Sequence, residues 1–213
     1  MEWWTEYSRF FTALLVVTDP FAAIPVFLAL TADASRRGRQ VAAMTTAATV
    51  AVLLIAAALA GEALLTWMGT SLASFRVGGG LVLLLMGVAM LRAEDDAIRT
   101  SPAERREARD ATRATIVPLG IPLLAGPGAI STVIIEMHRV GTAQHVLWVI
   151  AIILGVAAIL GAMLAFAEHL ASRLGILGLK IMNRLFGLIL TAVAVEIMAN
   201  GFRALFPVLS GGA

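Results

Sequence analysis

The chain of 213 residues contains no cysteine, a single tyrosine and only 14% charged residues. Without cysteine it has no disulfide, thiolate metal site or dithiol relay, which excludes a membrane thiol–disulfide carrier. A soluble chain would carry about 25% charged residues, whereas 60% of the residues here are hydrophobic. This composition excludes a soluble enzyme, a nucleic-acid-binding domain and a secreted module. It indicates an integral membrane protein.

Long apolar segments indicate six membrane spans. Each is close to the length of about 20 apolar residues that a helix needs to cross the hydrocarbon layer. They lie at residues 8–31, 41–65, 72–91, 114–137, 145–170 and 180–206. No basic region precedes the first span and Thr18-Asp19-Pro20 interrupts it, so we expect it to remain in the mature protein rather than to be cleaved as a signal. The predicted class is an all-α integral membrane protein.

The basic residues are distributed unequally between the two ends of these spans. All of them except Arg9, Arg76, Arg139 and Arg203 fall in or beside the connections after the first, third and fifth spans. The positive-inside rule therefore places these connections in the cytoplasm, including the charged segment 92–113. Both termini are then outside.

The two halves of the chain resemble each other. Asp19-Pro20-Phe21-Ala22 aligns with Gly126-Pro127-Gly128-Ala129, Glu62-x6-Gly69 with Glu168-x6-Gly175, and Arg76-x-x-Gly79 with Arg184-x-x-Gly187. Because three is an odd number of spans, the first copy ends on the opposite side of the membrane from where it began. The second copy therefore enters the membrane from the opposite face. The sequence thus predicts two inverted three-helix repeats, 1–91 and 114–213, joined by a cytoplasmic linker at 92–113. This architecture is typical of secondary transporters.

Proline and glycine interrupt the first and fourth spans near their midpoints. In hydrocarbon, backbone opened by proline persists only where it faces protein or a water-filled cavity. The half-helices that start there offer free N–H groups and a positive dipole end to a carboxylate. We therefore predict that substrate-binding residues lie at both breaks, although two packing kinks would give the same pattern. The predicted residues are Thr18, Asp19, Pro20, Phe21, Ala22, Gly126, Pro127, Gly128, Ala129, Ser131 and Thr132.

Asp19 stands out because a carboxylate in the middle of a span costs about 2.5–3.5 kcal/mol. It could bind a proton or a cation, face the ammonium of a zwitterionic substrate, or cap the half-helix that starts at Pro20. The hydroxyls of Thr18, Ser131 and Thr132 each fit an intrahelical hydrogen bond better than a ligand role. Asn183 is expected to be solvated at the inner end of the last span.

Glutamate and arginine residues near the span ends are candidates for gates. Glu62 and Arg76 lie near the outer ends of their spans, and Glu168 and Arg184 near the inner ends. They could form outer and inner gates that close alternately. They also fit interfacial charges whose side chains reach toward the headgroups, and we favour this second interpretation.

Motifs of catalysis, metal binding and nucleotide binding are absent from the sequence. Glu136, His138 and His145 match no compact metal site, and a solvated outer loop is expected for them. The run Gly78-Gly79-Gly80 lies in an apolar span, where small residues let helices approach closely. The sequence therefore predicts no enzyme, no catalytic residue, no metal site and no cofactor.

The motifs at the two breaks resemble those of the MarC family of bacterial inner-membrane proteins. The resemblance rests on Thr18-Asp19-Pro20-Phe21-Ala22-Ala23-Ile24-Pro25 and on the segment from Pro118-Leu119-Gly120 through Gly126-Pro127-Gly128 to Ser131-Thr132. Many family members carry Asn-Pro-x-Gly where this chain has Asp19-Pro20-Phe21-Ala22, which adds a charge. The resemblance implies a six-span inner-membrane protein related to amino-acid exporters, some of them assigned to small neutral amino acids.

Together these observations predict a secondary transporter, and more specifically an exporter, that moves a neutral amino acid such as alanine by alternating access. The substrate carboxylate would lie at the half-helix N-termini, and Asp19 would face the ammonium or carry a coupling proton. The expected partners are this substrate, a coupling proton or cation and the lipid bilayer, without nucleic acid. A homo-oligomer is compatible with the sequence. The alternatives are a passive channel for small ions or solutes and a scaffold for other membrane proteins.

Overall fold

The computed structural model describes residues 2–32, 34–92, 125–206 and 208. Within this part every regular element is a helix, which confirms the all-α class. The helices are α1 (Glu2–Thr18), α2 (Pro20–Leu30), α3 (Arg36–Trp67), α4 (Leu72–Arg92), α7 (Pro127–Met137), α8 (Ala143–Ala165) and α9 (Ala167–Leu205). Most of the predicted linker 92–113 and the first part of the predicted fourth span lie outside the described residues.

Five stretches of the described chain are long and apolar enough to cross a membrane. They are Thr5–Leu30, Arg36–Gly61, Leu72–Arg92, Ala143–Ala165 and Leu177–Leu205. Helix α7 is also apolar but shorter, and it corresponds to the second half of the predicted fourth span. The chain is thus a multi-pass integral membrane protein.

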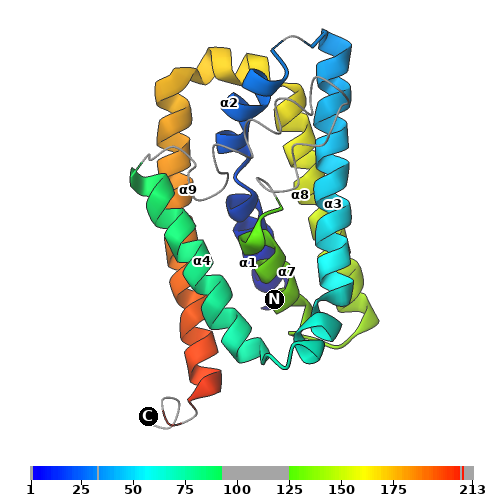
Figure 1. Ribbon diagram of the computed structural model, residues 1–213, viewed down its shortest axis with the longest axis vertical. Helices are drawn as coiled ribbons and strands as arrows, with labels where there is room; N and C mark the ends of the chain where they lie inside the picture. Colours follow the sequence, from blue (N-terminus) through cyan, green and yellow to red (C-terminus); the bar gives the residue numbers. More distant parts are fainter. Residues whose placement is uncertain (1, 33, 93–124, 207, 209–213) are drawn as a thin grey trace.

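The helices form a central group flanked by two helix pairs (Figure 1). Helices α4 and α9 pack along one side, and α3 and α8 along the other. Helices α1 and α2 follow one another through the centre, with α7 beside α1. Helix α1 begins and α9 ends at the same end of the molecule, which we call the terminal end. The opposite end, where α2 leads to α3 and α8 to α9, is the far end.

The fifth span ends earlier than predicted. Helix α8 ends at Ala165, not near residue 170, and the predicted connection after it is helical, because α9 already begins at Ala167. The change of direction occurs within α9 at Gly175, whose φ of 63° and ψ of 177° are not helical. Glycine adopts this φ without a steric penalty. The first part of α9 therefore crosses the far end before the chain turns into the last span (Figure 1).

Small residues bring α4 and α9 into close contact. A Cβ atom at Gly87 of α4 would lie 2.5 Å from the Thr191 hydroxyl oxygen and 3.0 Å from the Gly187 carbonyl oxygen of α9. A Cβ at Gly80 would lie 2.5 Å from the side chain of Met198. These glycines let the two backbones approach, as expected for an apolar span.

Gly87→Ala is expected to lower the melting temperature of the purified protein. The added methyl group must displace Thr191 or separate α4 from α9, which costs about 1–3 kcal/mol for an overpacked core. Gly78→Ala on the same helix is the matched control, because a Cβ there meets no atom within 4 Å. It should leave the melting temperature unchanged or raise it slightly, since alanine favours helix more than glycine does. Equal melting temperatures for the two variants would contradict the close packing.

Candidate functional site

The predicted break in the first span is a sharp turn at one residue. Helix α1 ends at Thr18 and α2 begins at Pro20. Between them Asp19 has a φ of 42° and a ψ of 68°, and among the described residues no other non-glycine has a positive φ. Aspartate tolerates this left-handed conformation better than most residues, because its short side chain can bond to nearby backbone. Pro20 fits the first helical position, where no N–H partner is needed.

The side chain of Asp19 caps α2. It is completely buried, with 0% of its surface exposed. The Ala22 N–H donates to Asp19 Oδ1 at 3.3 Å, and the positive end of the helix dipole favours a carboxylate at this position. One of the three roles predicted for Asp19 is therefore present. A cap does not exclude the other two, because an ionised carboxylate can accept several hydrogen bonds through its two oxygens.

The start of α7 differs from that of α2, because no side-chain hydrogen bond caps it among the described residues. Gly126 is extended, with a φ of −62° and a ψ of 173°, and Pro127 is the first helical residue. The N–H groups of Gly128 and Ala129 follow, at positions where a helix offers donors without intrahelical partners. Both residues are buried. A buried helix N-terminus of this kind is suited to an anionic group.

The two breaks lie next to each other. A Cβ at Gly128 would lie 3.2 Å from Val17 Cγ1 at the end of α1 and 2.6 Å from Leu83 Cδ2 of α4. In Figure 1 the start of α7 lies beside the junction of α1 and α2 in the middle of the molecule. The structure thus brings the start of α7 beside the end of α1 and its junction with α2, although these segments are distant in the sequence.

The hydroxyl groups near the breaks mostly bond within their own helices. Thr18 Oγ1 donates to the Leu15 carbonyl oxygen at 3.0 Å, and Thr132 Oγ1 donates to the Gly128 carbonyl oxygen at 2.8 Å. This matches the intrahelical interpretation favoured for them. Ser131 is buried on the side of α7 that faces α4, where a Cβ at Gly79 would lie 2.9 Å from its hydroxyl oxygen.

Asn183 is not solvated as predicted, because its Oδ1 atom is buried and has no hydrogen-bond partner among the described residues. Asn183 lies one turn before Phe186 on α9, and residues three apart share a helix face. The ring of Phe186 meets the ring of Phe21 edge-on, with centroids 5.2 Å apart. An unused acceptor therefore lies on the face of α9 that packs against the start of α2. The sequence signal that could have indicated the burial of Asn183 is the presence of an amide side chain within an apolar stretch.

The structure describes the side chains of three of the four predicted gate residues. Glu168 at the start of α9 forms an ion pair with Arg39 of α3 at the far end. Arg184 is exposed on α9. Arg76 lies on α4, where a Cβ at the neighbouring Gly201 of α9 would be 3.0 Å from its Cβ atom. The side chain of Glu62 lies outside the described part. The gate assignment of these four residues stays a prediction.

Arg39 was not predicted, yet it joins three segments at the far end. Besides the pair with Glu168, its Nη2 donates to the carbonyl oxygens of Thr31 and Ala34, each at 3.3 Å. It therefore ties α3 to the end of α2 and to the start of α9.

Glu136 and His145 are buried rather than solvated, with 8% and 3% of their surfaces exposed. The solvated loop predicted for them is wrong, because α7 continues to Met137 and Arg139 folds back onto the Glu136 carboxylate at 3.2 Å. Within the described residues, no group of three or more His, Cys, Asp or Glu side chains could hold a metal ion.

Comparison with known proteins covers nearly the whole chain. The family described as MarC family integral membrane protein matches residues 4–206. A UPF0056 membrane protein of Methanocaldococcus jannaschii is 36% identical over 193 residues, which cover 91% of this chain and 94% of that protein. The UPF0056 membrane proteins YhcE of Escherichia coli and YvbG of Bacillus subtilis are each 28% identical over 94% of this chain, and the matches cover 94% and 95% of those proteins. No solved structure matches the chain. The chain therefore belongs to the MarC family of integral membrane proteins.

Proposed function

We propose that this protein is a secondary transporter that exports a small neutral amino acid, such as alanine, across the bacterial inner membrane. The observation that carries the proposal is that the buried start of α7, which no described side chain caps, lies against the end of α1 next to the buried Asp19. An amino-acid zwitterion needs an acceptor for its ammonium close to a donor for its carboxylate. Asp19 offers the first, and the N–H groups of Gly128 and Ala129 offer the second.

The two helix starts suggest an orientation for the substrate. At α2 the carboxylate of Asp19 already accepts the Ala22 N–H, so this helix start is occupied by the protein's own anion. At α7 no described side chain takes that place. The substrate carboxylate would therefore bind at α7 and its ammonium would face Asp19. If transport is coupled to a proton, the carboxylate of Asp19 would take up this proton when the substrate leaves.

The helix pairing supports an inverted repeat. Helix α3 packs on α8 and α4 on α9, which pairs the second span with the fifth and the third with the sixth. The first span likewise contacts the fourth, through α1 and α7, although the alignment makes α2 and not α1 the equivalent of α7. Pairing of equivalent spans is expected around a two-fold axis in the membrane plane. We therefore propose six spans in two repeats, 1–91 and 114–213, with both termini outside and segment 92–113 in the cytoplasm.

Counterflow in proteoliposomes tests the proposal. Vesicles loaded with unlabelled L-alanine are expected to take up external labelled alanine in a saturable manner. Empty vesicles with the same protein, and loaded vesicles without protein, are the controls. Uptake that does not saturate and does not depend on internal alanine would indicate a passive channel. If alanine, glycine, serine and threonine all gave no exchange above the controls, the amino-acid assignment would be wrong and a scaffold role would gain support.

A further inference from the structure

Polar contacts join three helices at the terminal end. Arg139, in the connection between α7 and α8, pairs with Glu136 at 3.2 Å and with Glu6 of α1 at 2.7 Å. The Tyr7 hydroxyl of α1 lies 3.0 Å from Nδ1 of His145 on α8. Nε2 of His145 lies 2.9 Å from the carbonyl oxygen of Glu136. We call these five residues the clasp.

The hydrogen bonds of the clasp are mutually compatible. A carbonyl oxygen can only accept, so His145 Nε2 carries a proton, and in the neutral ring Nδ1 accepts from the Tyr7 hydroxyl. Burial lowers the pKa of the Arg139 guanidinium, but the carboxylates of Glu136 and Glu6 raise this pKa, and the net direction is upward. Arg139 therefore stays charged and bridges two carboxylates from different helices.

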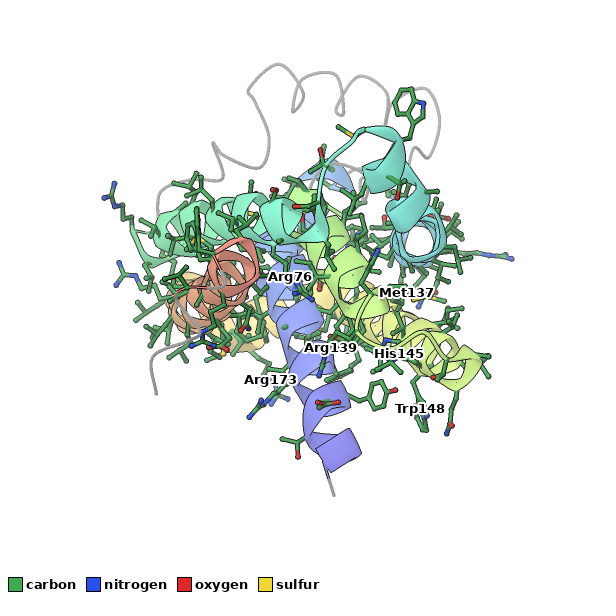
Figure 2. The ribbon with its side chains drawn as sticks, turned by 90° about the horizontal axis from the view of Figure 1, so that it is seen from below. Arg76, Met137, Arg139, His145, Trp148 and Arg173 are labelled. Atoms are coloured by element: carbon green, nitrogen blue, oxygen red, sulfur yellow. The ribbon has the colours of Figure 1, made fainter. Side chains whose placement is uncertain are left out.

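Helices α1 and α7 both extend from the clasp to the candidate site. From Tyr7 to Asp19, α1 rises by about 18 Å, and from Gly128 to Glu136, α7 rises by about 12 Å. The two helices contact each other, and near the site Gly128 lies against Val17. The clasp thus ties together the distal ends of the two helices whose proximal ends form the site. Figure 2 looks onto this end, where Arg139 lies beside α1 and His145 and Trp148 lie on the start of α8.

We propose that the clasp is the gate between the candidate site and the membrane face at the terminal end. While it is closed, α1 is held against α7 and α8. When the contacts of Arg139 and His145 break, α1 can separate from α7 and open a route along them to Gly128 and Asp19. The identity of the solute rests on the proposed function, whereas the gating of access does not.

The absence of cysteine from the sequence gives a direct test. Ala129→Cys places a single thiol at the start of α7, where the native residue is 1% exposed. Its rate of reaction with a membrane-impermeant maleimide is measured in spheroplasts and in inverted vesicles. Arg139→Gln and Glu6→Gln are each expected to raise this rate about fivefold or more from one face only, because they remove a partly buried ion pair.

Two further variants control for charge and position. Arg139→Lys keeps the charge and should keep labelling near that of the unmodified clasp. Arg203→Gln removes another arginine near the terminal end, whose described contact is with Asn200 of its own helix at 3.3 Å, and should not change the rate. Each protein is first checked by size-exclusion chromatography. If Arg139→Gln does not fold, Glu6→Gln decides, because the Glu6 side chain is 47% exposed and its loss leaves Arg139 and Glu136 still paired with each other.

Unchanged labelling in folded Arg139→Gln and Glu6→Gln proteins would overturn the gate. Faster labelling from both faces would overturn it too, because it would indicate general loosening of the helices. The outcome is separable from that of the proposed function. If labelling is faster from one face but the protein exchanges no amino acid, the gate proposal is supported and the proposed substrate is wrong. If alanine is exchanged but the clasp variants do not change the labelling rate, the transporter proposal is supported and the gate proposal is wrong.

Discussion

Asp19→Asn is expected to reduce counterflow of labelled alanine by about 10- to 100-fold while the melting temperature stays within a few degrees of the wild type. A hydrogen bond to a charged group contributes about 1.5–3 kcal/mol, and about 1.4 kcal/mol corresponds to a factor of ten. Asparagine keeps an oxygen that can accept the Ala22 N–H and tolerates the left-handed φ of 42° at this position. The cap therefore survives, and the negative charge facing the substrate is lost.

Asp19→Ala separates the two roles of this residue. It removes the charge and the cap together, and a lost cap costs about 0.5–2 kcal/mol. It also puts a Cβ-bearing residue without a polar side chain into the left-handed region, which costs about 1–2 kcal/mol. We therefore expect it to lose both exchange and stability. If Asp19→Asn exchanges alanine as fast as the wild type, Asp19 does not bind the ammonium, and gradient-driven uptake then tests whether it carries the coupling proton.

Gly128→Val is expected to abolish alanine exchange and to destabilise the protein by about 1–3 kcal/mol. A Cβ at this position would lie 2.6 Å from Leu83 Cδ2, 3.2 Å from Val17 Cγ1 and 3.3 Å from Met86 Sδ. The branched side chain must push the start of α7 away from α1 and α4. The start of α7 then moves away from the end of α1, which separates the two halves of the proposed zwitterion site, the N–H groups of Gly128 and Ala129 and the carboxylate of Asp19.

Gly155→Val is the matched control for this variant. Gly155 lies within α8, and a Cβ there meets no atom within 4 Å. Exchange kinetics at several alanine concentrations and thermal melts are compared for the two valine variants. A Gly128→Val protein with the KM of the wild type would show that the start of α7 is not where the substrate carboxylate binds. If Gly155→Val were equally impaired, the effect would come from valine in a span and not from the site.

The features that could be predicted from the sequence depend on local signals. Long apolar stretches set the spans, because each must cover the hydrocarbon layer by itself. The break at Asp19-Pro20 and the start of α7 at Pro127 follow from proline, which cannot continue a helical ladder. The cap by Asp19 is also a local feature, because it involves residues three positions apart, and it was therefore among the roles predicted for this residue. Close packing at Gly79 and Gly80 was likewise predictable from residue size, whereas the same prediction is wrong for Gly78, where a Cβ meets no atom within 4 Å.

The polar contacts at the two ends could not be predicted in this way. Arg39 pairs with Glu168, and Tyr7 with His145, between helices that are distant in the sequence. No sequence pattern around Arg39 or Tyr7 points to these partners. Apolarity alone also misplaced the end of α8, because the hydrophobic run continues past Ala165 into α9. The burial of Glu136 depends on Arg139, which folds back onto it and also pairs with Glu6 of α1. This arrangement requires α1 to lie beside α7, a tertiary contact that the sequence does not indicate.

The non-helical conformation of Gly175 divides α9 into two parts that pack against different helices. The part of α9 before it is anchored to α3 through Glu168 and Arg39, whereas the part after it is packed on α4 with Gly187 against Gly87. A rotation at Gly175, together with one at Gly69 in the short connection from α3 to α4, where φ is 68°, would swing α4 and the long part of α9 as a rigid body, while α3, α8 and the anchored segment stay in place. Gly175 would then act as a hinge, the kind of joint by which two packed units rock around a fixed centre. The central helices α1, α2 and α7 would form the contact surface between the moving and the stationary unit.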